Sequence, residues 1–418
     1  MTDLVLGFIP LLDCASLAVA HEHGFAEAEG LRLTLVRESS WANVRDRLVV
    51  GHFDAAHLLG PMTVASTLGI GHVQVPLVAP FAFGLGGNAI TVSTSLRSEM
   101  REHQAALSGG VDADSPGGEA RMAGEALRRV VHFRARNDLP PLTFGMVYPF
   151  SCHNYELRYW LAASGIHPDH DVRLVVIPPP LLVDSMRAGH LDGFCVGEPW
   201  NSVAVEAGVG SIALATTAIW KLSPEKVLGC RADWASRRPG ELAALLRCLY
   251  RASAWCADAR NHDDLARLLA DPRYVGAPTA LLRQALAGEP VLTKGEAPVR
   301  IEDFHVPLAH AATFPWVSHA LWFYSQMVRW GQTRWSAQQL ELVRATYRPD
   351  LYRTALAPLD LDIPDVDTRV EGRAGGSVAL PSSKGRMSFD NDGFFDGKLY
   401  DPLELRAYAT GFEIASPC

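Results

Sequence analysis

The strongest constraint on the fold is an alternation of short apolar runs with helical stretches, which occurs in two successive blocks of the chain. In the first block the apolar runs lie at residues 4–9, 31–36, 54–59, 73–78 and 89–94. In the second block they lie at residues 142–147, 172–177, 193–196, 212–215 and 227–230. This alternation is typical of α/β sheets, so each block is predicted to form one.

A short sequence pattern occurs once in each block. Residues 51–55 (GHFDA) are followed by Gly60-Pro61, and residues 189–193 (GHLDG) are followed by Gly197-Glu198-Pro199. Each copy is typical of a helix end, a tight turn, a buried strand and a glycine that opens the next helix. The repetition favours two lobes of similar construction, although any α/β protein can reuse such turns.

Outside the two blocks, the sequence predicts helices and two irregular segments. From residue 232 the chain is predicted to be mainly helical, with helices near residues 242–257, 264–269 and 337–347,. Residues 371–384 have the composition of a flexible linker, and residues 389–412 form a short aromatic tail,. A polar segment rich in Gly, Asp and Ser, residues 108–119, is predicted to be an insertion before the second block,.

Composition limits the partners and the compartment. The 418 residues carry a net charge of −8 and contain no basic run, so direct binding to nucleic acid is not expected,. The seven cysteines are scattered without CxxC spacing, which is typical of reduced thiols,. The N-terminus lacks the basic flank and the cleavage site of a signal peptide, and no apolar run approaches the length of a membrane span,. These features predict a cytoplasmic protein.

Candidate ligand-binding residues lie at strand-to-helix turns, where α/β sheets place their ligands. Trp41 follows such a turn and can offer an indole N–H while its ring packs below,. Asn88 follows the glycine-rich residues 84–87 (GLGG), which allow close approach of the backbone, and its amide can donate hydrogen bonds,. The structural alternatives are a core aromatic for Trp41 and a turn-forming amide for Asn88.

Three further candidates come from the second block. With Ser151 as N-cap, His153 falls in the first turn of a helix, where free backbone N–H groups and the helix dipole favour an anion,. Gly197 joins a strand to a helix and leaves its own amide accessible,. Lys226 precedes a strand that returns toward the first lobe and is a candidate counter-charge,. A surface cap for His153 and a solvated charge for Lys226 remain as alternatives.

One cation, an indole, an amide, an imidazole and a backbone N–H together suit a small planar oxyanion. An amino-acid ligand would also require an acidic partner for its ammonium group. The sequence contains none of the GxGxxG, GxxxxGK[ST], GxSxG or HExxH motifs, so no catalytic residue and no cofactor are predicted,. His21 and His23 diverge on a helix at their i, i+2 spacing, so no metal site is expected there,.

Several ordered motifs resemble those of the nitrate/bicarbonate binding-protein family of ABC transporters. They are GFIPLLDC at 7–14, SWANVRD at 40–46, DAAH at 54–57, GNAI at 87–90, CVGEPW at 195–200, WK at 220–221 and PEKVLG at 224–229. The matches run over nearly the whole chain. The resemblance implies the type II periplasmic-binding-protein fold, with two α/β lobes around a ligand cleft and two crossovers between them. Lobe 1 is then expected at residues 1–91 and 229–418, and lobe 2 at residues 92–228.

The same resemblance implies that five residues contact the ligand: Trp41, Asn88, His153, Gly197 and Lys226. In the bicarbonate-binding branch of the family we expect an acidic residue and a calcium ion at the position of Lys226. A lysine there therefore indicates nitrate or nitrite. Asn88 departs from the pattern, because transport members can carry a glutamine at this position.

Because no leader is apparent, the chain is similar to the cytoplasmic nitrate/nitrite sensors of the family (NasS type). This resemblance implies a protein partner, an RNA-binding ANTAR-domain antiterminator (NasT-like) that the sensor holds inactive until the anion binds. The alternative is an extracytoplasmic nitrate-binding subunit of an ABC transporter whose leader has been removed. Pyrimidine-precursor synthases share the implied fold, but their cysteine-dense motif CCCFC has no counterpart here.

Overall fold

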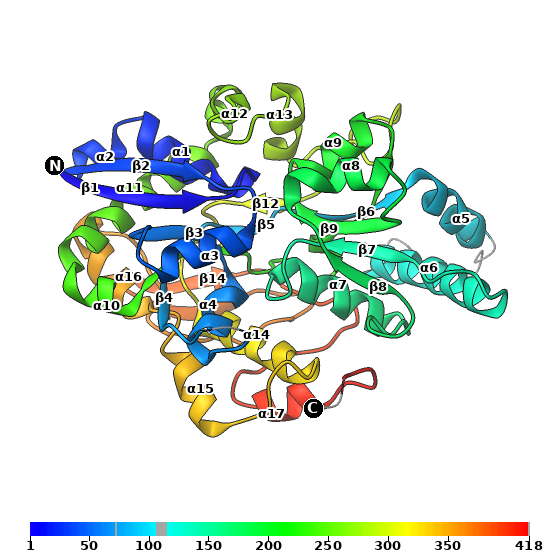
Figure 1. Cartoon of the computed structure of the whole chain (residues 1–418). Coiled ribbons are helices and arrows are strands. Elements are labelled where there is room, and N and C mark those ends of the chain that lie inside the picture. The colour runs from blue at the N-terminus through cyan, green and yellow to red at the C-terminus, as the bar shows by residue number, and fades with distance from the viewer. Residues whose placement is uncertain (72, 106–114, 417–418) are drawn as a thin grey trace.

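Two five-stranded sheets, one in each of two lobes, organise the protein (Figure 1). The computed structural model describes residues 1–71, 73–105 and 115–416. Across the first sheet the strands are β2 (Leu31–Arg37), β1 (Thr2–Phe8), β3 (Ala55–Leu59), β11 (Lys226–Arg231) and β4 (Leu77–Ala82). Across the second they are β10 (Gly210–Ala215), β6 (Asn88–Ser93), β9 (Gly193–Gly197), β7 (Thr143–Met146) and β8 (Arg173–Val176).

The chain crosses between the two sheets twice. It leaves the first sheet after β4, enters the second at β6, and returns from β10 to the first sheet at β11. There β11 runs antiparallel to both β3 and β4. The predicted α/β fold with two lobes is therefore confirmed. The lobe boundaries expected after residues 91 and 228 fall inside β6 and β11.

Helices cover both sheets, and the C-terminal part of the chain adds a further helical layer (Figure 1). In the first lobe they are α1 (Ala15–Glu22), α2 (Phe25–Ala28), α3 (Trp41–Val49), α4 (Gly60–Leu68), α10 (Ala232–Arg237) and α11 (Pro239–Ala257). In the second lobe they are α5 (Thr94–Ala105), α6 (Gly118–Arg136), α7 (Cys152–Ala163), α8 (Leu182–Arg187) and α9 (Trp200–Glu206). The C-terminal helices are α12 (His262–Ala270), α13 (Thr279–Ala287), α14 (Val317–Arg329), α15 (Ala337–Arg344), α16 (Pro349–Leu356) and α17 (Leu405–Thr410). Within the described residues, no helix is both long and apolar enough to cross a bilayer.

Serine caps start the two helices that carry predicted site residues. Ser40 Oγ accepts a hydrogen bond from the Asn43 N–H at 3.3 Å, which starts α3 at Trp41. The predicted cap Ser151 accepts from the Asn154 N–H at 3.2 Å, which places His153 in the first turn of α7. These caps satisfy backbone donors that a helix start leaves free, so the local sequence fixes where each helix begins.

The edge strand β4 lies four residues farther along the chain than the predicted strand at 73–78, so this prediction is wrong in register. Val73 is 72% exposed, and pairing with β11 begins only after Pro76, at Leu77. The strand then runs through Pro80, which has no N–H to donate. A proline is tolerated here because β4 is at the edge of the sheet and its pairing with β11 shifts at this point,.

The outer side of β4 is not open. The Ala79 N–H donates to the Thr346 carbonyl at 2.8 Å, and the Ala82 N–H donates to the Thr313 carbonyl at 3.0 Å. Both acceptors belong to the C-terminal part of the chain. This part therefore takes up the backbone donors that an unpaired edge strand would otherwise expose.

Residues 371–384 are not the flexible linker that the sequence predicts. They lead into a hairpin of β13 (Val378–Ser382) and β14 (Gly385–Phe389). Glu371 is fully buried, where it pairs with Arg369 at 2.9 Å and accepts a hydrogen bond from Ser318 Oγ at 2.8 Å. One charged residue of this segment, Glu371, belongs to a buried network, and the sequence pattern does not distinguish such a residue from one in a solvated linker.

The aromatic tail packs against the second lobe. The ring of Phe394 lies 4.6 Å from that of Trp220 and 5.3 Å from that of Tyr159, between ring centroids. A short pairing of β5 (Leu85–Gly86) with β12 (His305–Val306) lies close to the point where the chain first crosses between lobes. The predicted insertion at 108–119 lies mostly outside the described residues.

We expect Glu371→Gln to lower the free energy of unfolding by about 3 kcal/mol, because it leaves the buried Arg369 without its main partner. Asp392 lies 4.0 Å from Arg369 and holds the loss to the lower end of the usual range. Urea unfolding monitored by tryptophan fluorescence measures the effect. The exposed neighbour Arg373 supplies the control, since Arg373→Gln is expected to change stability by less than about 0.5 kcal/mol,. Equal stability of both variants would mean that the buried network contributes nothing.

Candidate functional site

Strand register brings two of the predicted site residues side by side. Asn88 opens β6 and Gly197 ends β9, and their Cα atoms are direct partners in the second sheet. A Cβ atom on Gly197 would lie 3.2 Å from Asn88 Oδ1 and 3.5 Å from Lys226 Nζ. A side chain at position 197 would therefore intrude between the amide and the ammonium group, and glycine leaves that space open.

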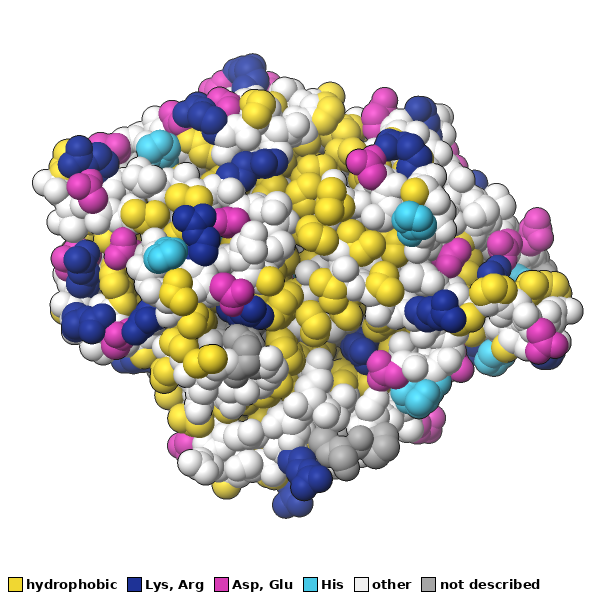
Figure 2. Space-filling view, in the orientation of Figure 1, with side chains coloured by type: hydrophobic (Ala, Val, Ile, Leu, Met, Phe, Trp, Pro, Cys, Tyr) yellow, Lys and Arg dark blue, Asp and Glu magenta, His cyan; other side chains and the backbone are white. Residues whose placement is uncertain are grey.

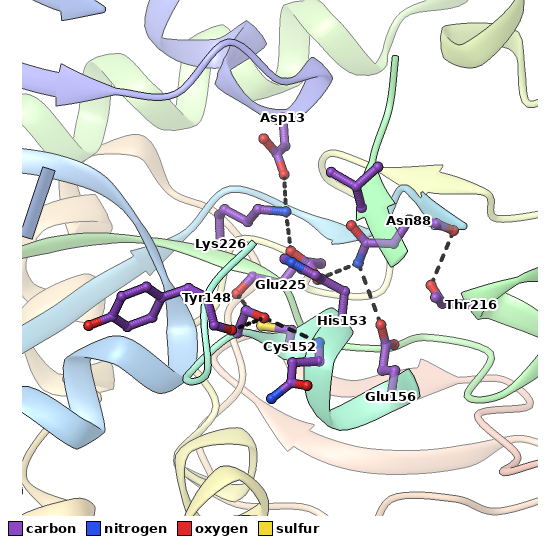
Figure 3. A network of polar contacts seen from close by, with 12 residues as sticks. Asp13, Asn88, Tyr148, Cys152, His153, Glu156, Thr216, Glu225 and Lys226 are labelled. Carbon is purple, nitrogen blue, oxygen red and sulfur yellow. Dashed lines mark hydrogen bonds and ion pairs between the residues drawn. The ribbon is translucent and has the colours of Figure 1, made fainter. Parts of the chain in front are cut away.

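Lys226, the predicted counter-charge, is buried and already paired. Its Nζ lies 2.8 Å from Asp13 Oδ2 and also donates to Glu225 Oε2 (Figure 3). The side chain has no exposed surface. The alternative prediction of a solvated surface lysine is thus wrong. The positive charge of Lys226 is also not wholly available to a ligand, because two carboxylates already pair with it.

The pKa values in this triad follow from burial and charge pairing. Burial alone would lower the pKa of Lys226, but Asp13 and Glu225 outweigh it and raise that pKa well above its usual value. Burial opposes ionisation of Asp13 as well, yet Lys226 and His57 hold the pKa of its carboxyl far below the usual range. The pKa of Glu225 is lowered in the same way, chiefly by Lys226 against the effect of burial. All three groups are therefore charged at neutral pH.

His153 and Glu156 face the same triad from α7. His153 Nδ1 lies 3.8 Å from Glu225 Oε1, which is too long for a hydrogen bond,. Burial lowers the pKa of His153, so the imidazole is neutral at pH 7. Burial and the nearby Glu225 carboxylate raise the pKa of Glu156 to about 8, so this carboxyl is mostly protonated. The Asn88 side-chain amide lies between the two acids and donates to both of them.

Trp41 joins the cluster through His57. Its ring centroid is 5.5 Å from that of His57, whose Nε2 lies 3.0 Å from Asp13 Oδ1. Asp13 in turn contacts Lys226. All five predicted residues therefore belong to one continuous buried cluster, although they come from five separate elements of the chain.

The cluster contains polar atoms that need a partner. Within the described part of the chain, no hydrogen bond reaches Trp41 Nε1, either ring nitrogen of His153, or Asn88 Oδ1. Each such buried group costs about 1–3 kcal/mol when it is left unpaired. The arrangement is thus suited to a small polar ligand that accepts hydrogen bonds from the indole and the imidazole.

Contacts between the lobes close this cluster off from solvent. The Leu12 N–H donates to the Glu198 carbonyl at 2.8 Å, and Trp200 Nε1 donates to the Pro10 carbonyl at 3.1 Å. The Arg45 guanidinium donates to the Tyr148 hydroxyl on the opposite lobe. Figure 2 shows hydrophobic side chains gathered along the middle of the face where the lobes meet. A ligand in this site would be enclosed, so the lobes must separate for it to enter or leave.

Four residues of the cluster had no predicted role: Asp13, His57, Glu156 and Glu225. Their common signal is an ionisable side chain within an apolar or buried segment, such as His57 in the middle of the strand β3. A buried ionisable group requires a charged or hydrogen-bonded partner. This requirement indicates that the four residues belong to a polar site, but it does not identify which groups pair with each other.

The neighbouring thiol has no nucleophilic character. Cys152 Sγ donates to the Glu225 carbonyl at 3.2 Å, and burial raises the pKa of the thiol well above its usual value. A neutral, hydrogen-bonded thiol is a poor nucleophile. The site is therefore built from hydrogen-bond donors and fixed charges, which suits binding.

Comparison with known proteins identifies the family. Residues 1–270 match the model of the NMT1-like family. The chain is 32% identical over 99% of its length to the nitrate import ATP-binding protein NrtC of Synechocystis sp. PCC 6803, of which it spans 55%. It is 33% identical over 86% of its length to the bicarbonate transport ATP-binding protein CmpC of Synechococcus elongatus PCC 7942, of which it spans 50%.

A solved structure extends the comparison to the fold. The crystal structure of the periplasmic nitrate-binding protein NrtA from Synechocystis PCC 6803 superposes with a TM-score of 0.83 and 28% sequence identity, and 99% of each chain is covered. The match therefore includes both lobes and the C-terminal part. The chain belongs to the NMT1-like family and has the two-lobed periplasmic-binding-protein fold of NrtA.

Proposed function

We propose that this protein binds nitrate or nitrite between its lobes and is not an enzyme. The observation that carries the proposal is the buried cluster in which Trp41 Nε1 and the His153 ring nitrogens lack partners beside the charged Lys226. A planar oxyanion accepts several directed hydrogen bonds at once, which is what these donors require. The similarity to NrtA and NrtC, whose names give nitrate as the ligand, supports the same choice.

Bicarbonate is the competing anion, since CmpC is about as similar in sequence as NrtC. The cation at the site favours nitrate. In the bicarbonate-binding branch of the family we expect an acidic residue and a calcium ion at this position, whereas Lys226 provides a permanent positive charge there,.

We further propose that the protein is a cytoplasmic sensor whose partner is an ANTAR-domain antiterminator. Six of the cysteines are buried free thiols, as is typical of compartments that keep thiols reduced,. The net charge of −8 suits contact with a protein partner better than contact with RNA,. If the partner binds the open arrangement of the lobes, nitrate weakens it by stabilising the closed arrangement.

A nitrate-binding subunit of an ABC transporter is the second candidate. It is supported by the match to NrtC and by superposition on the periplasmic protein NrtA over both lobes and the C-terminal part. The anion site and the closure of the lobes would be the same in both cases. The two functions differ in the partner that responds to closure, which is an RNA-binding regulator that binds the open protein or a membrane permease.

Trp41→Phe should weaken nitrate binding about ten- to a hundredfold, because a hydrogen bond to a charged acceptor contributes about 1.5–3 kcal/mol. Stability without nitrate should not fall, since Trp41 Nε1 has no partner to lose within the described residues. Isothermal titration with sodium nitrate measures the affinity. Trp316→Phe is the matched control, because Trp316 is equally buried, has an unpartnered Nε1 among the described residues and lies near Phe389, away from the site.

The same titration separates the anions. Nitrate or nitrite is expected to bind, whereas bicarbonate with calcium is not. Binding of bicarbonate alone would contradict the proposal, and unchanged nitrate affinity in Trp41→Phe would remove the indole from the site.

A partner experiment distinguishes the two candidate roles. We expect the purified protein to form a complex with the ANTAR-domain antiterminator of its own genome, and nitrate to dissociate that complex on size exclusion. By linkage, the partner must weaken nitrate by the same factor by which nitrate weakens the partner. A complex that nitrate does not dissociate, or the absence of any complex, would contradict the proposed sensor role. Stimulation of the cognate transporter's ATPase in proteoliposomes would then identify the transport subunit.

A further inference from the structure

The charge at the site sets a problem for any anion that binds there. Lys226 contributes one positive charge, while Asp13 and Glu225 contribute two negative charges. Glu156 is mostly neutral at pH 7 because burial and the Glu225 carboxylate raise its pKa to about 8. These three ion-paired groups therefore together carry one net negative charge. A nitrate ion would add a second one in an enclosed, weakly screened site.

His153 is placed to compensate for the added negative charge by taking up a proton. Neither of its ring nitrogens has a hydrogen-bond partner within the described residues, and Nδ1 faces Glu225 Oε1 at 3.8 Å. An anion that accepts a hydrogen bond from Nε2 would leave the ring between two acceptors, the anion and Glu225. A neutral imidazole can donate from only one nitrogen, so two acceptors require a second proton.

We propose that nitrate enters this site together with one proton, which is taken up by the His153–Glu225 pair. The inference rests on the proposed function and deepens it, because it makes the proton a second ligand of the same site. The added proton is carried at Nδ1, the ring nitrogen that faces Glu225 Oε1 at 3.8 Å, and the two groups titrate as a pair,. Its positive charge offsets the negative charge that the anion brings.

The other ionisable groups around the pair do not provide this proton site. On α7, burial keeps the pKa of Cys152 well above its usual value, so this thiol is already protonated, and Glu156 is mostly so. On β9, burial keeps Cys195 protonated by raising its pKa in the same way. These groups have little capacity to accept a proton at pH 7.

Three groups face the cluster from the first lobe and its C-terminal part. Burial lowers the pKa of His305 on β12 to about 4, and none of the carboxylates in the described part of the chain is paired with this ring. Asp13 is held ionised by Lys226 and by His57, which leaves it the weaker base. His57 Nε2 lies 3.0 Å from Asp13 Oδ1, so this ring faces a carboxylate at ion-pair distance already in the unliganded protein. His153 with Glu225 remains as the pair that gains an acceptor when the anion arrives.

The sign of the pH dependence follows from the linkage. The pKa of His153 is lowered by burial in the free protein, and the bound anion raises the proton affinity of the pair. Nitrate affinity is therefore greatest at acidic pH and falls about tenfold per pH unit above the free-state pKa of the pair. Above pH 8, deprotonation of Glu156 adds a further loss of affinity, which Glu156→Gln removes.

Calorimetry counts the proton directly. Sodium nitrate is titrated into the intact protein at pH 7.0 in buffers with different ionisation enthalpies, and the slope of observed enthalpy against buffer enthalpy gives the protons taken up. We expect about one proton per nitrate for the native protein. Nitrate binding with no proton uptake would overturn the inference while leaving the proposed function intact. No nitrate binding at any pH would instead overturn the proposed function.

Two isosteric variants locate the proton. Glu225→Gln removes one negative charge, so nitrate should bind with little proton uptake and with an affinity that hardly changes between pH 6 and 8. Glu156→Gln is the matched control on the other side of Asn88, and it should keep the native proton uptake because this acid is already neutral. Uptake that persists in Glu225→Gln, or disappears in Glu156→Gln, would place the proton elsewhere and overturn the assignment.

Discussion

The rest of the site depends on one interaction, the buried contact of Lys226 with Asp13 and Glu225. An isolated ammonium ion would not remain charged at this depth, and two isolated carboxylates would not either. Together they stay ionised and hold both lobes in contact with one charged centre. Asp13 follows the first strand of lobe 1, whereas Glu225 receives the Asn88 amide from β6 of lobe 2. The charged triad is therefore also the point at which the two lobes interact electrostatically, so a change in the position of one lobe alters the interactions of the other.

Much of the fold could be predicted because it depends on local pattern. Alternating apolar runs indicated where most strands lie along the chain, and the predicted cap Ser151 marked the start of α7. The failures came where contacts distant in sequence decide the outcome. The register of β4 depends on Pro80 and on its pairing with β11, and the structure of residues 371–384 depends on the buried partners of Glu371.

The site shows the same division. Its five predicted residues were found because strand ends and helix starts are visible in the sequence, and the structure brings them into one cluster. The ion pairs were not found, because nothing in the neighbourhood of Lys226 in the sequence reveals Asp13, which is more than two hundred positions away. Electrostatics at a buried site depends on all neighbours at once, so the charge available to a ligand cannot be deduced from one residue type.

The sealed edge of β4 has a consequence for the integrity of the molecule. The Thr346 and Thr313 carbonyls occupy backbone donors of the outermost strand, and Pro80 in the same strand has no N–H to donate. A protein shortened before residue 313 would keep the complete central sheets but would present an open strand to other molecules,. Such a fragment would associate strand to strand with its own copies. The C-terminal quarter of the chain thus protects the molecule against this strand-to-strand association.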